Sequence, residues 1–157
     1  MTTPLFSKLN LGAAARAVVL DAPASFEPEI EALAAAQPAL ELTRRLPTSL
    51  KLDFALAFVT TLAQVEQAAT ALAAAGVDDV VLWFAYPKGT SKRYRCEFNR
   101  DTGWAALVAL GFESVRMVAI DEDWSALRFR RAEHVGRTKR DAQPAPRAVA
   151  RNKAEKR

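Results

Sequence analysis

The side chains best suited to binding chemistry cluster in residues 88–100. The basic members are Lys88, Lys92, Arg93, Arg95 and Arg100, opposed by Glu97 alone and interleaved with Tyr86 and Tyr94. Arginine binds oxyanions through two parallel hydrogen bonds, and aromatic rings stack on flat groups. The pattern therefore suits a phosphate, a carboxylate or a nucleic-acid strand. A solvated loop whose charge only aids solubility is equally compatible with it.

Two residues suited to ligand binding, Lys88 and Asp21, come directly after predicted strands. Lys88 comes after Tyr86 and Pro87, and the proline fixes the direction in which the lysine leaves the strand. Asp21 comes after an earlier strand, and open α/β sheets bind ligands at the carboxyl ends of strands. Asp21 suits a hydrogen-bond acceptor for a ligand, although a turn or cap is the more common role. Asp21, Tyr86, Lys88 and Arg100 form the predicted set.

The other reactive groups lack the partners that catalysis or metal binding requires. Cys96 lies near Arg93 and Arg95, which would lower its pKa, but the only histidine, His134, is remote and no base is at hand. An incidental loop thiol is therefore favoured. Residues 121–123 place three carboxylates in one turn, which would suit a divalent cation, yet acidic turns are usually just solvated. We expect no metal site, and catalytic residues remain unidentified.

The elements that must position these residues alternate between strands and helices. Apolar runs predict strands at 17–20, 40–46, 52–60 and 80–86. Helices are predicted at 26–36, 61–75 and 99–110. Thr61 and Gln64 fit a capping box at the start of the second helix, and Gly76 would end it. The run 52–60 is continuous enough to lie centrally in a sheet covered on both faces.

The last two predicted strands, 115–120 and 125–131, are separated only by the acidic turn, a spacing that suits an antiparallel hairpin. Strands joined through helices require right-handed crossovers and a parallel sheet. We therefore expect an α/β fold of three Rossmann-like layers, with a mostly parallel sheet and a C-terminal antiparallel hairpin.

Length and charge predict one domain and a tail. The chain has 157 residues, half of them hydrophobic, and a net charge of +4. Residues 134–157 hold eight basic and two acidic residues, so they carry +6 and the remainder carries −2. We expect a folded domain over 1–133 and a disordered tail over 134–157. Without a signal peptide or an apolar run long enough to span a membrane, a cytoplasmic location is expected.

The predicted strand order is similar to the methyltransferase variant of the Rossmann fold with one strand missing. Three motifs narrow the likeness: Tyr86-Pro87-Lys88, Asn99-Arg100-Asp101 with Gly103-Trp104, and the segment 123–129 (DWSALRF). With them the chain, over roughly 7–131, resembles an uncharacterised bacterial family, domain of unknown function 3052. This resemblance implies the methyltransferase-like fold and carries no established activity.

The predicted cofactor loop argues against an active methyltransferase. Residues 21–25 contain no glycine, although only a residue without Cβ lets the backbone approach a cofactor closely. The next strand ends in Thr43, Arg44 and Arg45 and offers no carboxylate for ribose hydroxyls. Neither GxGxxG nor a P-loop occurs in the sequence. We expect no cofactor and no useful affinity for S-adenosylmethionine.

Three functional hypotheses fit these patterns. The first is a non-enzymatic, methyltransferase-like binding module that recognises an acidic small molecule or a protein partner through Asp21, Tyr86, Lys88 and Arg100. The second is a transferase, dependent on S-adenosylmethionine or another donor, with an atypical cofactor loop. The third is a nucleic-acid-associated protein that makes weak contacts through its basic tail. No membrane partner is expected.

Overall fold

The computed structural model describes residues 3–45, 51–98 and 102–135. Its helices are α1 (Pro4–Lys8), the short 3-10 helix η1 (Ala24–Phe26), α2 (Glu27–Ala36), α3 (Leu62–Ala75) and α4 (Ala105–Ala109). Its strands are β1 (Arg16–Leu20), β2 (Glu41–Thr43), β3 (Leu52–Phe58), β4 (Gly76–Pro87), β5 (Phe112–Ala119) and β6 (Trp124–Arg131). Among these described residues, no helix has the length and apolar character needed to cross a membrane.

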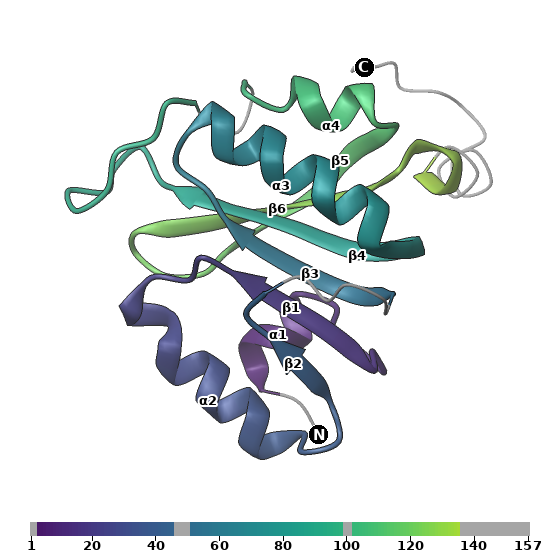
Figure 1. Ribbon diagram of the computed structural model, residues 1–157. Coiled ribbons are helices and arrows are strands. Elements are labelled where there is room, and N and C mark those ends of the chain that lie inside the picture. Colours follow the sequence, from purple (N-terminus) through teal and green to yellow (C-terminus); the bar gives the residue numbers. More distant parts are fainter. Residues whose placement is uncertain (1–2, 46–50, 99–101, 136–157) are drawn as a thin grey trace, which may run out of the picture.

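The strands form one mixed sheet in the order β2-β1-β3-β4-β6-β5. The first four run parallel, whereas β6 lies antiparallel to both β4 and β5. In Figure 1, α1 and α2 lie below the sheet and α3 and α4 above it. The predicted three-layer Rossmann-like fold is confirmed, and so are its antiparallel hairpin and the interior position of β3. The hairpin folds back so that its second strand, β6, meets the parallel part of the sheet.

Helix α3 begins as its sequence predicts. The Thr61 hydroxyl accepts the Gln64 N–H at 3.1 Å, and the Gln64 side chain accepts the Thr61 N–H at 3.2 Å. This reciprocal capping satisfies two of the donors that a helix N-terminus leaves free. Gly76 ends the helix, but in an extended conformation that starts β4 at once. A Cβ there would lie 2.8 Å from Val80 Cγ1, so close packing rather than a left-handed turn requires the glycine.

The two faces of the sheet carry separate apolar clusters. The face toward α1 and α2 includes six aromatic side chains, namely Phe6, Phe26, Phe54, Phe58, Trp83 and Trp124. The face toward α3 and α4 includes Phe84, Trp104 and Phe129. Trp83 is fully buried, and its indole N–H donates to the Leu9 carbonyl at 2.7 Å, so its only polar group has a partner. Each large side chain buried in this way contributes about 1.5–3 kcal/mol to folding.

Several predicted boundaries were wrong. Strand β2 contains only Glu41–Thr43, and α4 begins at Ala105 because the chain first turns at Gly103, which has a positive φ of 89°. The predicted cap Asn99 lies outside the described residues. His134 and Val135, the two residues that follow the expected domain end at Glu133, are buried. The rest of the predicted tail, 136–157, and with it the expected nucleic-acid contact, lies outside the described residues.

Candidate functional site

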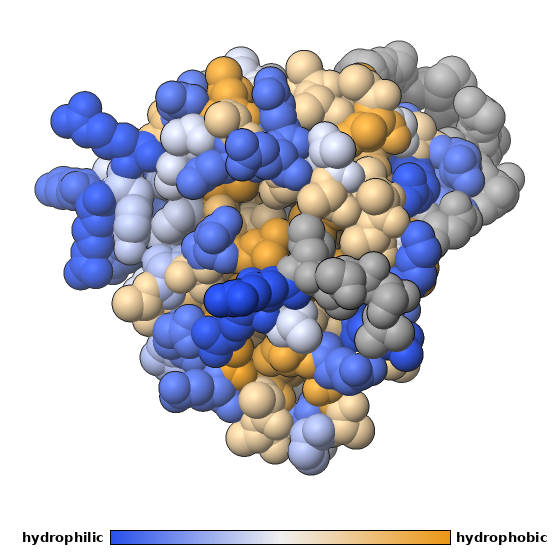
Figure 2. Space-filling model, viewed as in Figure 1, coloured by the Kyte–Doolittle hydropathy of each residue, from blue (hydrophilic) through white to orange (hydrophobic). Residues whose placement is uncertain are grey.

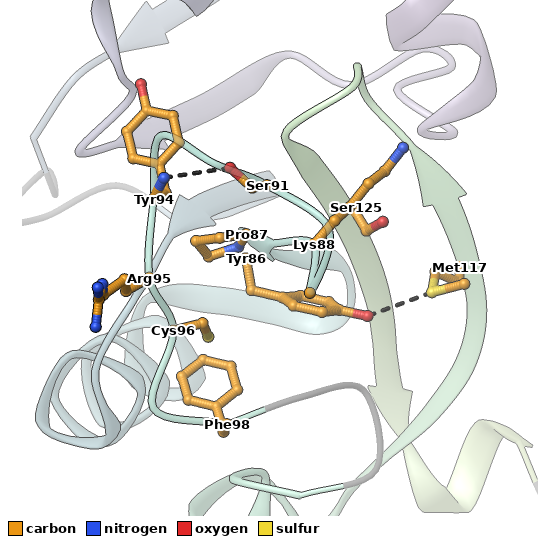
Figure 3. A pocket seen from close by; sticks show the side chains of 11 residues that line it. Tyr86, Pro87, Lys88, Ser91, Tyr94, Arg95, Cys96, Phe98, Met117 and Ser125 are labelled. Atoms are coloured by element: carbon orange, nitrogen blue, oxygen red, sulfur yellow. Dashed lines mark hydrogen bonds between the residues drawn. The ribbon is translucent and has the colours of Figure 1, made fainter.

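A cleft opens at the carboxyl end of β4, beside the start of β6 (Figure 3). Its volume of about 530 Å³ is within the range of small-molecule sites. The lining residues are Tyr86, Pro87, Lys88, Gly89, Ser91, Tyr94, Arg95, Cys96, Phe98, Met117 and Ser125. Most of them belong to the β4–α4 loop (residues 88–104), and β5 and β6 supply the last two.

Tyr86 crosses the inner wall of the cleft. Its side chain is only 4% exposed and packs edge-on against Trp104, with ring centroids 5.6 Å apart. Its hydroxyl donates to the Met117 sulfur at 3.3 Å, and Figure 3 shows the ring lying between Met117 and Phe98. A buried phenol held by packing and by a weak sulfur acceptor is a rigid surface against which a ligand can pack.

Lys88 is held by its backbone, while its ammonium group has no partner among the residues that the structure describes. Its N–H donates to the Asp123 carbonyl at 2.8 Å, which extends the pairing of β4 with β6 past Pro87. No hydrogen bond or ion pair to Lys88 Nζ occurs within the ranges that the structure describes. Figure 3 shows the side chain extending alongside Ser125. A half-buried cation in such a place is available to an anionic ligand.

Ser91 fastens the loop to the β5–β6 turn. Its Oγ donates to Asp123 Oδ1 at 2.9 Å and accepts the N–H groups of Arg93 and Tyr94 at 3.3 and 3.2 Å. The Tyr94 ring then packs on Trp124 with centroids 4.9 Å apart. Polar and aromatic contacts together fix this half of the loop.

The single acidic residue predicted to oppose the basic cluster, Glu97, is used elsewhere. Its N–H donates to the Thr60 carbonyl at 3.0 Å, and its Oε1 accepts the Leu62 N–H at 2.8 Å. The carboxylate thus lies at the N-terminus of α3, where the helix dipole favours negative charge. It contributes to the loop's second attachment and does not line the cleft.

Among the residues that the structure describes, the lining therefore includes two cations, Lys88 and Arg95, and no carboxylate. The neighbouring Arg93 instead lies 3.9 Å from Asp123 Oδ2. Lys92, Arg93 and Arg95 are exposed, and Figure 2 shows strongly hydrophilic side chains projecting where Figure 1 draws this loop. The cleft has a positive rim around an aromatic interior.

Cys96 is a cleft residue without the features of a nucleophile. Burial raises the pKa of its thiol, and the charge of Glu97 raises it further. The nearby arginines do not produce the lowering that their spacing in sequence suggested, since Arg95 projects away from the thiol in Figure 3. The preference for an incidental thiol agrees with this environment.

The structure brings together only part of the predicted ligand-binding set. Tyr86 and Lys88 line one cleft. Asp21 is exposed, adopts a positive φ of 57°, and does not belong to that lining. Its conformation is that of a tight turn after β1, the alternative weighed for it. Arg100 lies outside the described residues.

Sequence reasoning missed Met117 and Ser125, the two cleft residues that come from outside residues 86–98. Ser125 pairs with Tyr86 across β4 and β6, and the side chain of Met117 reaches the Tyr86 hydroxyl from β5. These neighbours depend on the order of strands in the sheet. The alternation along residues 124–131 was the only available signal, and it does not specify the partner strand.

The acidic turn serves structure. Asp121 Oδ1 accepts the N–H groups of Asp123 and Trp124 at 2.8 and 2.9 Å, a side-chain turn that closes the β5–β6 hairpin. The Asp123 carboxylate accepts the Ser91 hydroxyl. Within the described ranges, no three acidic, histidine or cysteine side chains are grouped as a metal site would require.

At the carboxyl end of β1, side chains take the place of the glycines found in nucleotide-binding loops. Phe26 of η1 packs on Phe58 at the end of β3, with centroids 4.9 Å apart. Phe58 in turn contacts Trp124 at 5.0 Å. The exposed fraction of each of these three side chains is 3% or less. The strand order reverses between β1 and β3, so this aromatic row borders the point where open α/β sheets usually bind ligands.

Comparison with known proteins establishes the architecture. No family model matches the chain, and no curated protein matches it. Among solved structures, the N-methyltransferase NodS from Bradyrhizobium japonicum WM9 aligns over 81% of this chain and 92% of its own, with 15% identity and a TM-score of 0.53. A SAM-dependent methyltransferase from Aquifex aeolicus aligns over 80% and 87%, with 10% identity and a TM-score of 0.58.

The chain has a methyltransferase-like fold. The mitomycin 7-O-methyltransferase MmcR gives the same result, with a TM-score of 0.59 and 15% identity over 78% of this chain and 50% of its own. At these identities the likeness concerns the fold alone, because one fold hosts many functions. Within this methyltransferase-like fold, the cleft lies at β4, one strand further along the sheet than the point where the strand order reverses.

Proposed function

We propose that this protein is a non-enzymatic binding module that holds an acidic small molecule in the cleft at the carboxyl end of β4. The observation that carries the proposal is the charge of the lining, in which the described residues include the cations Lys88 and Arg95 and no carboxylate. An oxyanion bound to Lys88 Nζ would supply the negative charge that no described residue places beside this ammonium group. Ser125 lines the same cleft and offers a hydroxyl donor.

The aromatic interior supports a ligand that also carries a flat or apolar part. Tyr86 and Phe98 offer ring surface that is held in place by Trp104, since Phe98 packs on Trp104 with centroids 4.9 Å apart. Binding energy in such sites comes mainly from apolar contact, while a few polar groups set orientation. An aromatic carboxylate or a phosphorylated aromatic compound combines both features.

The chemistry of the lining supports binding without catalysis. A general base or a nucleophile near neutral pH is needed for most transfer reactions. The Cys96 thiol has a raised pKa, and the Tyr86 hydroxyl already donates a hydrogen bond to the Met117 sulfur. The described histidine, His134, lies after the end of β6 near Asp79 at the start of β4. Seven residues of extended strand separate Asp79 from Tyr86, a distance of roughly 23 Å.

A transferase that depends on S-adenosylmethionine is the second candidate, favoured by the fold shared with NodS and the Aquifex enzyme. One NodS structure contains S-adenosyl-L-homocysteine. The glycine-free loop after β1 and the Phe26 ring packed beside it weigh against this candidate. Calorimetric titration with S-adenosylmethionine separates the two, and a dissociation constant in the low micromolar range would replace the binding-module proposal with the transferase.

Thermal unfolding with defined probes tests the binding module. 4-Hydroxybenzoate and phenyl phosphate combine an anion with a ring, and benzyl alcohol is the uncharged comparison. A probe at 100 times its dissociation constant stabilises the folded state by about 2.7 kcal/mol. We expect this stabilisation with the anionic probes only.

Two lysines of one loop supply matched variants. Lys88→Ala removes a lining cation, whereas Lys92→Ala removes an exposed cation outside the lining. We expect the first to weaken anionic probe binding at least tenfold, about 1.4 kcal/mol, and the second to leave it within twofold. Equal effects of both variants, or no stabilisation by either anionic probe, would contradict the proposal.

We also propose that the chain belongs to the family that it resembles, domain of unknown function 3052. The Tyr86-Pro87-Lys88 motif contributes the cleft wall and its central cation, and the 123–129 motif begins β6 beside it. Membership of domain of unknown function 3052 is thus supported by motifs that meet at one site.

A further inference from the structure

A pair of arginines faces the opposite side of the sheet from the cleft. Arg116 of β5 and Arg128 of β6 are direct cross-strand partners in the antiparallel register. Arg128 lies two and four residues from Ala126 and Trp124, which belong to the cluster on the α1 and α2 side. Ser125, a cleft residue, points to the other side. The arginine pair and the cleft therefore form separate surfaces.

Both guanidinium groups share a single neutral acceptor. Arg116 Nη1 and Arg128 Nη1 donate to the Asn10 side-chain oxygen at 3.2 and 3.4 Å. Asn10 lies after α1 in a left-handed conformation with φ of 61°, next to Leu9, whose carbonyl is held by the indole of Trp83. Trp83 is itself the register partner of Arg128 on β4. The position of Asn10 is therefore fixed by buried packing.

The positive charge of this pair is not balanced within the described part of the chain. Neither Arg116 nor Arg128 has a carboxylate within 4 Å there. Asp79, the carboxylate whose charge acts on Arg128, is instead engaged at two points by Arg130, at 2.9 and 2.8 Å. Like charges directly opposite one another on neighbouring strands are destabilising. The described part of the chain thus places two cations together and supplies one amide oxygen as the acceptor for both.

Arg128 is also partly withdrawn from water. Its Nε is buried and has no hydrogen-bond partner among the described residues. Desolvation, together with the charges of Arg130 and Arg116, lowers the pKa of the guanidinium although Asp79 raises it. Leaving a charged donor buried without a partner carries a free-energy cost. A negative charge bound beside the Nη groups would offset part of the cost of burying this charged side chain.

We propose that Asn10, Arg116 and Arg128 form a second anion site, which takes a phosphate group. Two guanidinium groups carry a charge of +2, which a phosphate monoester dianion neutralises more fully than a single carboxylate does. Phosphate oxygens also accept the paired N–H groups of arginine in the planar geometry that arginine offers. The site does not depend on the function proposed for the cleft.

The test monitors the arginine side chains directly in the full-length protein. The Nε–H signals of Arg116 and Arg128 are recorded by NMR during titration with inorganic phosphate, glycerol 2-phosphate or acetate, at constant ionic strength set with sodium chloride. We expect saturable shifts with one or both phosphates and at least tenfold weaker binding of acetate. Stronger binding of glycerol 2-phosphate would assign the site to a phosphoryl group on a larger ligand, and stronger binding of inorganic phosphate to the free ion.

Three variants make the outcome decisive. Arg116→Gln, at the more exposed arginine, should weaken phosphate binding at least tenfold, whereas Arg44→Gln, which breaks an exposed pair with Glu27, should leave it unchanged. Asn10→Asp places a carboxylate between the two arginines, so we expect a higher melting temperature and loss of the phosphate response. Shifts that never saturate, equal effects of Arg116→Gln and Arg44→Gln, or an Asn10→Asp protein that keeps the phosphate response would overturn the proposal.

Discussion

Charged residues differ between the two ends of the parallel strands, which we call the amino edge and the carboxyl edge of the sheet. At the amino edge, where β1 and β3 start, Asp53 Oδ2 accepts the N–H groups of Ala15 and Arg16 at 2.9 and 3.0 Å. Arg130 and Asp79 form a two-point ion pair at the same edge. At the carboxyl edge, Lys88 has no such partner in the described structure and lies in a cleft.

This difference separates charges that hold the fold from charges that are available to a ligand. A charge satisfied by its own protein contributes to stability, and its removal costs free energy of folding. A charge left to solvent contributes little to stability and can be used for recognition. Stability measurements on variants at both edges therefore test the assignment of the cleft without knowledge of its ligand.

The largest effect is expected at Asp53. Asp53→Ala removes the acceptor of two backbone N–H groups at the start of β1, and hydrogen bonds to a charged group contribute about 1.5–3 kcal/mol. We expect the free energy of unfolding in urea to fall by about 2 kcal/mol. A fall below about 0.5 kcal/mol would mean that the amino edge does not depend on this carboxylate.

Ser91 is expected to have the next largest effect, because it is the polar anchor between the cleft loop and the β5–β6 turn. Ser91→Ala removes one donated and two accepted hydrogen bonds, and we expect a loss of about 1 kcal/mol. Ser25→Ala, at an exposed position of η1, is the matched control and should change stability by less than about 0.5 kcal/mol. Equal losses in urea unfolding would contradict the assigned anchor.

The Asp79–Arg130 pair should have a smaller, pH-dependent effect. The hydrogen bond from Arg130 lowers the pKa of Asp79 below its ordinary value of 3.8. The pair therefore stabilises the fold above about pH 4 and loses its contribution as the pH falls through the lowered pKa. Because Asp79 is partly exposed, Asp79→Asn should cost less than about 1 kcal/mol at pH 7. A difference from the parent that persists undiminished at pH 2 would contradict this origin.

The smallest effects are expected at the carboxyl-edge cations. Lys88→Ala and Lys92→Ala should each change the free energy of unfolding by less than about 0.5 kcal/mol, since neither ammonium group has a protein partner in the described structure. Differential scanning calorimetry without added ligand measures this directly. A loss at Lys88 as large as that at Asp53 would remove the distinction between the two edges.

Most of the fold was predictable because it arises from local pattern. Strand and helix periodicity, the Thr61 capping box and the short turn before β6 each act within a few residues. Asp53 shows the kind of contact that such patterns miss. It interrupts an otherwise apolar run, yet its partners, the Ala15 and Arg16 N–H groups, are 38 and 37 residues away in sequence. Only the pairing of β1 with β3 brings them together.

The site was predictable only in part, for the same reason. Lys88 was found because a strand that ends in proline fixes the direction of the next residue, and Tyr86 because aromatic residues are interleaved with the cations of this stretch. Met117 and Ser125 enter the cleft through the order of β4, β6 and β5, which no local pattern encodes. Asp21 was placed at the usual ligand position of the fold, whereas the cleft is at a different strand.

Gly103 sets a geometric limit on the cleft although it does not line it. The residue has a positive φ, and a Cβ built on it would lie 2.6 Å from the Phe98 Cβ. Phe98 forms one wall of the cleft and rests against Trp104. Any side chain at position 103 would have to push this ring out of its place. The position of the Phe98 wall, and with it the width of the cleft, therefore depends on residue 103 having only a hydrogen atom as its side chain, although residue 103 does not line the cleft.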